Sequence, residues 1–160
     1  MTQIKYKLQI NLILIFSILS ILFAFYVEYI LGHKPCNLCL FQRLPYILII
    51  FLIILLLIFR NFERLIFLFL SIIFLSGALL ALYHVGIEQG IFSESFVCKG
   101  DDNDGTLNKE KILKQLKIRQ ISCKDVTFTM LGVSLATINT FVSMILAIIT
   151  FKIFIKYEKK

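Results

Sequence analysis

The chain has 160 residues, of which 59% are hydrophobic and 17% charged, and it carries a formal net charge of +7. About a quarter of an average soluble domain is charged, so this composition excludes a soluble globular protein, as well as the disordered, collagen-like and small disulfide-scaffold classes. In a soluble protein the positive charge would indicate nucleic acid binding. Here much of it flanks apolar segments, and we expect contact with membrane lipid and no nucleic acid.

Four stretches are long and apolar enough to cross a bilayer, which requires about 20 mainly apolar residues. They run over residues 8–30, 39–59, 65–84 and 130–151. The second is apolar on every side from Ile47 to Phe59, which excludes the alternation of a β-barrel strand. The sequence predicts an all-α membrane protein: a four-transmembrane-helix bundle that forms a single integral membrane domain over residues 1–160, with loops at about 31–38 and 85–129 on one face.

A C-x-x-C motif, Cys36 to Cys39, lies at the entrance to the second span. A thiolate near a helix N-terminus is stabilised by the positive end of the helix dipole and by a neighbouring cation. If the helix continues through residue 43, Arg43 lies one turn beyond Cys39 on the same face, where its guanidinium could hold a thiolate or a carbonyl. The alternative is an arginine that snorkels to the headgroups, and position alone does not separate the two. Pro45 is compatible with a helix near its start.

The third span ends near His84, at the same membrane edge as Arg43. The two side chains could hydrogen-bond the two ends of a polar headgroup, although a lone histidine here is more often an interfacial residue with a satisfied hydrogen bond. The long loop that follows carries Cys98 and Cys123. A polar turn over residues 99–105 comes directly after Cys98, so we expect this cysteine to be accessible.

All four cysteines fall on one face, which leaves several interpretations open. They could form reactive pairs, inert structural disulfides, or a zinc site that combines all four. Structural zinc sites usually have closely spaced ligands in both halves, and Cys98 and Cys123 are 25 positions apart, so we expect no metal.

Basic residues predict which way the chain is oriented. In the termini and short loops, two Lys or Arg on the cysteine face oppose eight on the other face. The positive-inside rule therefore predicts cytoplasmic termini and cysteines in the oxidising exoplasmic compartment.

Three stretches carry a resemblance to a known family: Pro-Cys-Asn-Leu-Cys-Leu-Phe-Gln-Arg-Leu-Pro-Tyr at residues 35–46, Tyr83-His84 at the end of the third span, and Leu-Gly-Val-Ser at residues 131–134. With the second cysteine pair between them, they resemble the bacterial disulfide bond formation protein B (DsbB) family over nearly the whole chain. The family often has a Trp after the last cysteine and a Pro or Trp further into the fourth span. The corresponding residues here are Phe128, Ala136 and Ile138.

The resemblance implies an inner-membrane oxidoreductase that reoxidises a periplasmic DsbA-like thioredoxin-fold protein and passes the electrons to a quinone, ubiquinone or menaquinone. It implies that the partner attacks a Cys98–Cys123 disulfide, with Cys98 forming the mixed disulfide. Cys123 would then attack Cys36, and the freed Cys39 thiolate would donate two electrons. These steps agree with the thiol chemistry expected of accessible, low-pKa cysteines.

The resemblance also implies that Arg43 and His84 contact the quinone, which carries the oxidising power. Two rival functions stay open. One is a quinone reductase similar to vitamin K epoxide reductase, whose C-x-x-C typically comes after the other cysteine pair. The other is a non-catalytic membrane protein that binds metal or acts as a scaffold.

Overall fold

Four long helices form the structure, a computed structural model that describes residues 2–58, 63–94, 98, 122–126, 128–130 and 132–156. Within these ranges four helical stretches are long and apolar enough to span a membrane: Tyr6–Ile30, Asn37–Ile58, Arg64–Glu88 and Leu135–Lys156. The predicted helical membrane bundle is therefore confirmed. Most of the long loop, including the polar turn at 99–105, lies outside the described residues.

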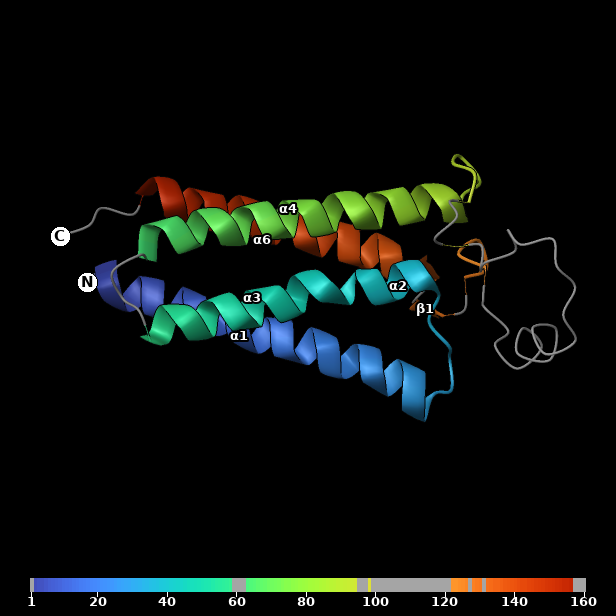
Figure 1. Ribbon diagram of the computed structural model, residues 1–160, viewed down its shortest axis with the longest axis horizontal. Helices are drawn as coiled ribbons and strands as arrows, with labels where there is room; N and C mark the ends of the chain where they lie inside the picture. Colours follow the sequence, from blue (N-terminus) through green and yellow to red (C-terminus); the bar gives the residue numbers. More distant parts are fainter. Residues whose placement is uncertain are drawn as a thin grey trace, which may run out of the picture.

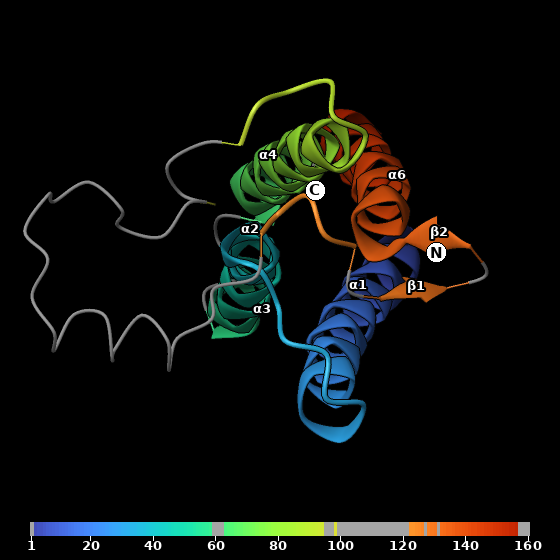
Figure 2. The ribbon, with the colours of Figure 1, turned by 90° about the vertical axis from the view of Figure 1, so that its right-hand side faces the viewer.

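The helices lie side by side along one axis (Figure 1). They are α1 (Thr2–Phe25), which continues as a π-helical turn η1 (Tyr26–Ile30), α2 (Asn37–Phe41), α3 (Arg43–Ile58), α4 (Glu63–Glu88) and α6 (Leu135–Lys156). Figure 2 looks along the bundle: α3 lies between α1 and α4, and α6 packs against α4. The start of α1 and the end of α6 meet at one end, where the Tyr6 hydroxyl donates to the Lys156 carbonyl at 3.0 Å. We call the opposite end, where η1 ends and α2 begins, the cysteine end.

The second span is interrupted at Gln42, between α2 and α3. Pro45 explains the interruption, because its ring clashes with the carbonyl four residues earlier and it has no N–H to bond that carbonyl. The residue four positions earlier is Phe41, the last of α2. The second span nevertheless continues through residue 43 with a turn at Gln42, whose backbone keeps helical angles (φ −67°, ψ −15°), and the Gln42 side chain is buried.

The third long helix continues one turn past His84 and ends at Glu88. Gly90 has φ +74°, a left-handed conformation that favours glycine. Its N–H donates to the Ile87 carbonyl at 2.9 Å and the N–H of Ile91 donates to the Gly86 carbonyl at 2.8 Å, the paired bonds of a Schellman cap. This cap sets the helix end and leaves His84 inside the helix, buried.

Before α6 the chain forms a small antiparallel ladder of β1 (Thr129–Met130) and β2 (Val133–Ser134), with Thr129 opposite Ser134 and Met130 opposite Val133. Gly132, in the connection, has φ +81°. The ladder adds four strand residues to an otherwise helical fold, and α6 starts after it, at Leu135.

Small side chains let the helices approach closely. A Cβ added at Gly77 of α4 would lie 3.4 Å from Cβ and Cγ of Pro45 on α3. On its other side α4 meets α6, where the Ser71 hydroxyl donates to the Ala147 carbonyl at 3.1 Å. A buried apolar cluster fills the middle of the bundle and consists of Ile10, Ile13, Tyr46, Ile49, Ile53, Leu56, Ile66, Phe67, Leu70, Phe74, Ala147 and Ile153.

We expect Gly77→Leu to destabilise the bundle by about 1–3 kcal/mol, because the larger side chain forces α4 away from Pro45. Gly77→Ala is the control, since its Cβ reaches only ordinary contact distance. Thermal unfolding in detergent, followed by circular dichroism, measures both variants. A Gly77→Leu protein as stable as Gly77→Ala would show that the contact does not limit the packing of α3 on α4.

Candidate functional site

A second buried cluster gathers the cysteines at the cysteine end of the bundle. Its buried members are Cys36, Leu38, Ile87, Cys98 and Cys123, and Cys39, Leu80 and Tyr83 pack against it. Residues from the first loop, α4 and the long loop therefore meet in one place. Cysteines more than 60 positions apart in the sequence lie within a single packed group.

Cys36 and Cys39 are both thiols in this structure. Cys36 is the N-cap of α2, and its sulfur accepts the backbone N–H of Cys39 at 3.3 Å. The two sulfurs lie 2.9 Å apart. Cys36 is buried, whereas Cys39 is partly exposed.

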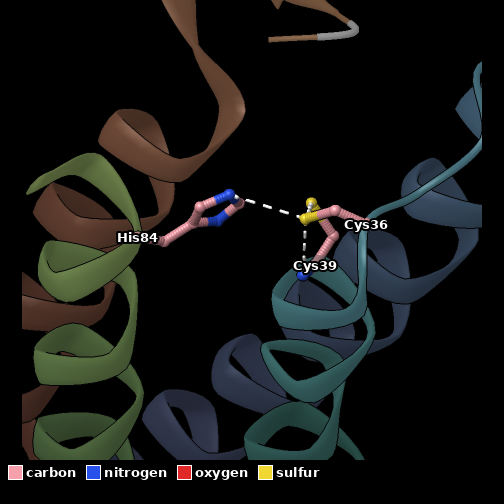
Figure 3. Close-up of side chains that lie close together, drawn as sticks. All are labelled: Cys36, Cys39 and His84. Carbon is pink, nitrogen blue, oxygen red and sulfur yellow. Dashed lines mark hydrogen bonds between the residues drawn. The ribbon is translucent and has the colours of Figure 1, made fainter. Parts of the chain in front are cut away.

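His84 reaches this pair from α4, as Figure 3 shows. Its Nε2 lies 3.5 Å from the Cys36 sulfur and 3.8 Å from Oε1 of Glu88, one helical turn further along α4. The backbone of Cys123 also lies beside the His84 ring. The imidazole is therefore next to both cysteine pairs.

The other ring nitrogen of His84 begins a chain of hydrogen bonds that crosses the bundle. Nε2 of Gln42 lies 2.9 Å from His84 Nδ1, and Nδ2 of Asn139 donates to Oε1 of Gln42 at 3.1 Å. The Tyr46 hydroxyl donates to Oδ1 of Asn139 at 2.5 Å, and the Ser143 hydroxyl donates to the same oxygen at 3.3 Å. Side chains from α3, α4, α6 and the break after α2 are thus joined.

The thiol of Cys36 is strongly acidified. The hydrogen bond from Cys39 and then the contact with His84 lower the pKa of Cys36 to about 4, against burial, which raises it. Hydrogen bonding to the charged form favours that form. Cys36 is therefore a thiolate at neutral pH when the pair is reduced.

Arg43 is the first residue of α3, and a turn at Gln42 separates it from α2, which carries Cys39. Its guanidinium forms an ion pair with Oε2 of Glu28 at 2.6 Å and lies over the Phe25 ring, 5.2 Å from the centroid. Both partners belong to the first span and its π-helical end. The sequence suggested that Arg43 could hold a Cys39 thiolate, whereas in the structure Arg43 pairs with Glu28.

A cavity of about 250 Å³ opens between α1, α3, α4 and α6 at the cysteine end. Most of its wall is apolar, and its polar wall residues include Cys36, Cys39, Gln42, Arg43, Tyr46, His84, Glu88 and Asn139. Four of the six site residues predicted from the sequence, Cys36, Cys39, Arg43 and His84, therefore surround one space. Such a space, mainly apolar with a few convergent polar groups, is typical of a small-molecule site.

The other two predicted cysteines, Cys98 and Cys123, form a disulfide that does not line the cavity. It packs beside Cys36 instead, with Cys98 4% and Cys123 1% exposed. The expectation that Cys98 is accessible is wrong in this conformation, because Ile87, Leu38 and Cys36 bury the disulfide with them. Cys98 and Cys123, joined as a disulfide, have no free thiolate to offer a metal in this structure.

Three groups could still coordinate a metal ion. The sulfurs of Cys36 and Cys39 and a ring nitrogen of His84 all lie within 4.8 Å of one another, and two thiolates with an imidazole form a ligand set that zinc accepts. Coordination through Nε2 would require that nitrogen to be without hydrogen, whereas a thiolate and a carboxylate face it here.

Sequence reasoning assigned no site role to Glu28, Gln42 or Asn139. Asn139 is an amide inside an otherwise apolar span, and polar residues in such spans usually have a partner or a function. That signal was available from the sequence. The sequence did not show that the partner of Asn139 is Gln42, 97 positions away.

Comparisons with known proteins name one family twice, through a family model and through one short match. The model of the family described as DsbB, disulfide bond formation protein DsbB, matches residues 6–153. The chain is 31% identical over 147 residues, 90% of this chain and 85% of the other, to Uncharacterized protein RP370 of Rickettsia prowazekii. A 41-residue stretch is 42% identical to Disulfide bond formation protein B of Acinetobacter baumannii and covers 26% of this chain and 24% of that protein. No solved structure matches.

We expect the reduced protein to show a thiolate that persists far below the ordinary thiol range. Because the pKa of Cys36 is lowered to about 4, the thiolate is present above that pH and is lost as the pH falls through it. Ultraviolet thiolate absorbance across a pH titration, compared with a reduced Cys36→Ser variant, isolates this group. A titration of Cys36 near its ordinary value of about 8.5 would refute the expectation.

Proposed function

Because the chain belongs to the DsbB family of disulfide bond formation proteins, we propose that this oxidoreductase carries electrons from a periplasmic DsbA-like dithiol protein to a membrane quinone, ubiquinone or menaquinone. One observation supports the proposal most directly. A disulfide, Cys98–Cys123, and a dithiol, Cys36 and Cys39, pack in one cluster beside a largely apolar cavity. Two cysteine pairs in contact can exchange a disulfide, and the cavity offers room for the final acceptor.

Electrons enter through thiol–disulfide exchange. The partner's thiolate attacks Cys98, so that a partner–Cys98 bond forms, the Cys98–Cys123 bond breaks and Cys123 leaves as a thiolate. Cys123 then attacks Cys36 of an oxidised C-x-x-C pair, and Cys39 leaves as a thiolate. The partner's second thiol releases Cys98, which re-forms the Cys98–Cys123 bond and frees Cys36. The net change is an oxidised partner and a reduced Cys36–Cys39 pair, the state of the two pairs in this structure.

Exchange between the pairs requires close approach, and the packing supports it. Cys36 and Cys123 belong to one buried cluster, and His84 contacts both residues. The first step needs more than this conformation offers, because Cys98 is buried. Attack by a partner therefore requires Cys98 to move away from Ile87 and Cys36.

The cavity fits the head of a quinone. Ligand pockets usually measure about 300–1000 Å³, so a space of about 250 Å³ suits a ring and not its long tail. When bound, a quinone supplies the oxidising power by accepting two electrons and two protons. Cys39 would lie against it in the cavity wall, and Arg43 and His84 would hold its polar edge.

Arg43 is suited to bind a carbonyl. A guanidinium has five N–H donors, of which one is used in the bond to Glu28. Glu28 also neutralises the positive charge at the membrane edge, where an unpaired ion is costly. The pair thus keeps a charged donor in place without exposing a net charge to lipid.

We propose that the chain forms one integral domain of the bacterial inner membrane, with its termini in the cytoplasm and its cysteines in the periplasm. The fold supports a common location for the cysteines, because all four lie at the end opposite the start of α1 and the end of α6. The excess of Lys and Arg at the termini supports the direction. An oxidising compartment is also where a disulfide persists.

Quinone reduction by purified protein in detergent, supplied with a reduced thioredoxin-fold dithiol protein, tests the proposal. We expect turnover, followed by quinone absorbance, that is abolished in Cys39→Ser. In Cys98→Ser the C-x-x-C pair should still be oxidised by quinone, but transfer from the partner should be lost. Absence of turnover together with stoichiometric zinc on the protein would favour a metal-binding membrane protein instead.

Arg43→Ala should raise the apparent KM for quinone tenfold or more, because a charge-assisted hydrogen bond contributes about 1.5–3 kcal/mol. Arg64→Ala is a matched control. Arg64 also lies 5.2 Å from an aromatic centroid, that of Phe154, but outside the cavity wall. Quinone kinetics of the two variants separate a binding role from loss of a surface cation. An unchanged KM in Arg43→Ala would remove Arg43 from the quinone site.

A further inference from the structure

A chain of hydrogen-bonded side chains runs toward Cys36, and one of its members, Asn139, lies outside the stretches that carry the family resemblance. Tyr46 donates to Asn139, Asn139 donates to Gln42, and the Gln42 amide nitrogen lies 2.9 Å from Nδ1 of His84. Beyond the ring, His84 Nε2 lies 3.5 Å from the Cys36 sulfur. We call Tyr46, Asn139, Gln42 and His84 the donor chain.

The acceptors around His84 decide the direction of this chain. Nε2 faces the sulfur of Cys36 and the carboxylate of Glu88. The sulfur already accepts the N–H of Cys39, as a thiolate does. A nitrogen among such acceptors carries hydrogen, and in a neutral imidazole the other nitrogen is then an acceptor. The amide N–H of Gln42 meets this requirement at Nδ1.

We propose that Asn139 is a positioning residue: through Gln42 it holds the neutral His84 ring with its Nε2 hydrogen directed at Cys36. The inference rests on the proposed function only in treating the Cys36 thiolate as a redox group. Each donor in a chain of hydrogen bonds polarises the next, so the hydrogen bond that His84 donates to Cys36 is stronger than one from an isolated histidine.

The location of the chain explains why orientation matters. Gln42 is 9% exposed and His84 3% exposed, so an unpaired amide or ring nitrogen there would be costly. Without Asn139, the Gln42 amide is free to turn its oxygen toward Nδ1. The ring would then carry its hydrogen on Nδ1 and present a lone pair to the Cys36 thiolate, which destabilises the thiolate.

The experiment measures directly which ring nitrogen of His84 carries hydrogen. The chain has two histidines, His33 and His84, so ¹⁵N-histidine labelling of the reduced full-length protein in detergent gives two rings, which a His33→Gln variant assigns. We expect ¹⁵N shifts of a neutral His84 ring with protonated Nε2 and unprotonated Nδ1 at neutral pH. A ring protonated on Nδ1, alone or with Nε2, in the unmutated protein would overturn the proposal without any variant.

Asn139→Leu removes the amide at similar size and should populate the Nδ1-protonated tautomer. It should also raise the midpoint of the Cys36 thiolate titration by about one pH unit, measured with Cys98 and Cys123 both replaced by Ser so that no other pair absorbs. Tyr46→Phe, a milder change, should shift both readouts in the same direction by less. Asn139→Leu keeps every charged or titratable group that shares this environment: His33, Cys39, Arg43, Tyr46, Glu88, Asp125 and Glu28, the partner of Arg43.

Thr140→Val is the matched control for Asn139→Leu. Thr140 is the next residue on α6, and its hydroxyl donates to the Ala136 carbonyl of its own helix at 2.8 Å. It should leave both the tautomer and the titration unchanged. Identical readouts in Asn139→Leu and Thr140→Val would overturn the proposal. Because neither readout needs quinone or partner, a correct tautomer in a protein that reduces no quinone would reject only the proposed function.

Discussion

The need to pair every polar group inside an apolar bundle governs the cysteine end of this protein. Lipid offers no hydrogen bonds, so amide and imidazole groups among the helices must bond to one another. The link from His84 through Gln42 to Asn139 meets this need and ties α4, the break in the second span and α6 together. These hydrogen bonds fix how each helix is turned about its own axis, and this orientation places His84 beside Cys36.

Gln42 and Arg43 serve the site in different ways although they are neighbours in the chain. Successive residues of a helix point about 100° apart, so the two side chains leave the second span in different directions. Gln42 is buried against His84, while Arg43 reaches Glu28 on the first span.

Reactivity at the site follows from the unequal surroundings of the two thiols. Cys36 is buried, accepts a backbone N–H and lies beside His84, whereas Cys39 is partly exposed. Both thiols line the cavity, and both belong to or pack against the cluster that holds the second cysteine pair. The two thiols therefore differ in burial and in hydrogen bonding.

Local sequence properties determined much of this protein. Apolar runs of sufficient length predict the four spans, and the count of spans predicts that all four cysteines share one end, since both depend only on composition along the chain. The C-x-x-C motif, Arg43 and His84 could likewise be placed at one edge of the bundle. Only the tertiary structure decided that Arg43 pairs with Glu28, that Gln42 bonds Asn139 and that Cys98 is buried beside Cys36. These contacts depend on how the helices are rotated, and side-chain packing between distant segments sets that rotation.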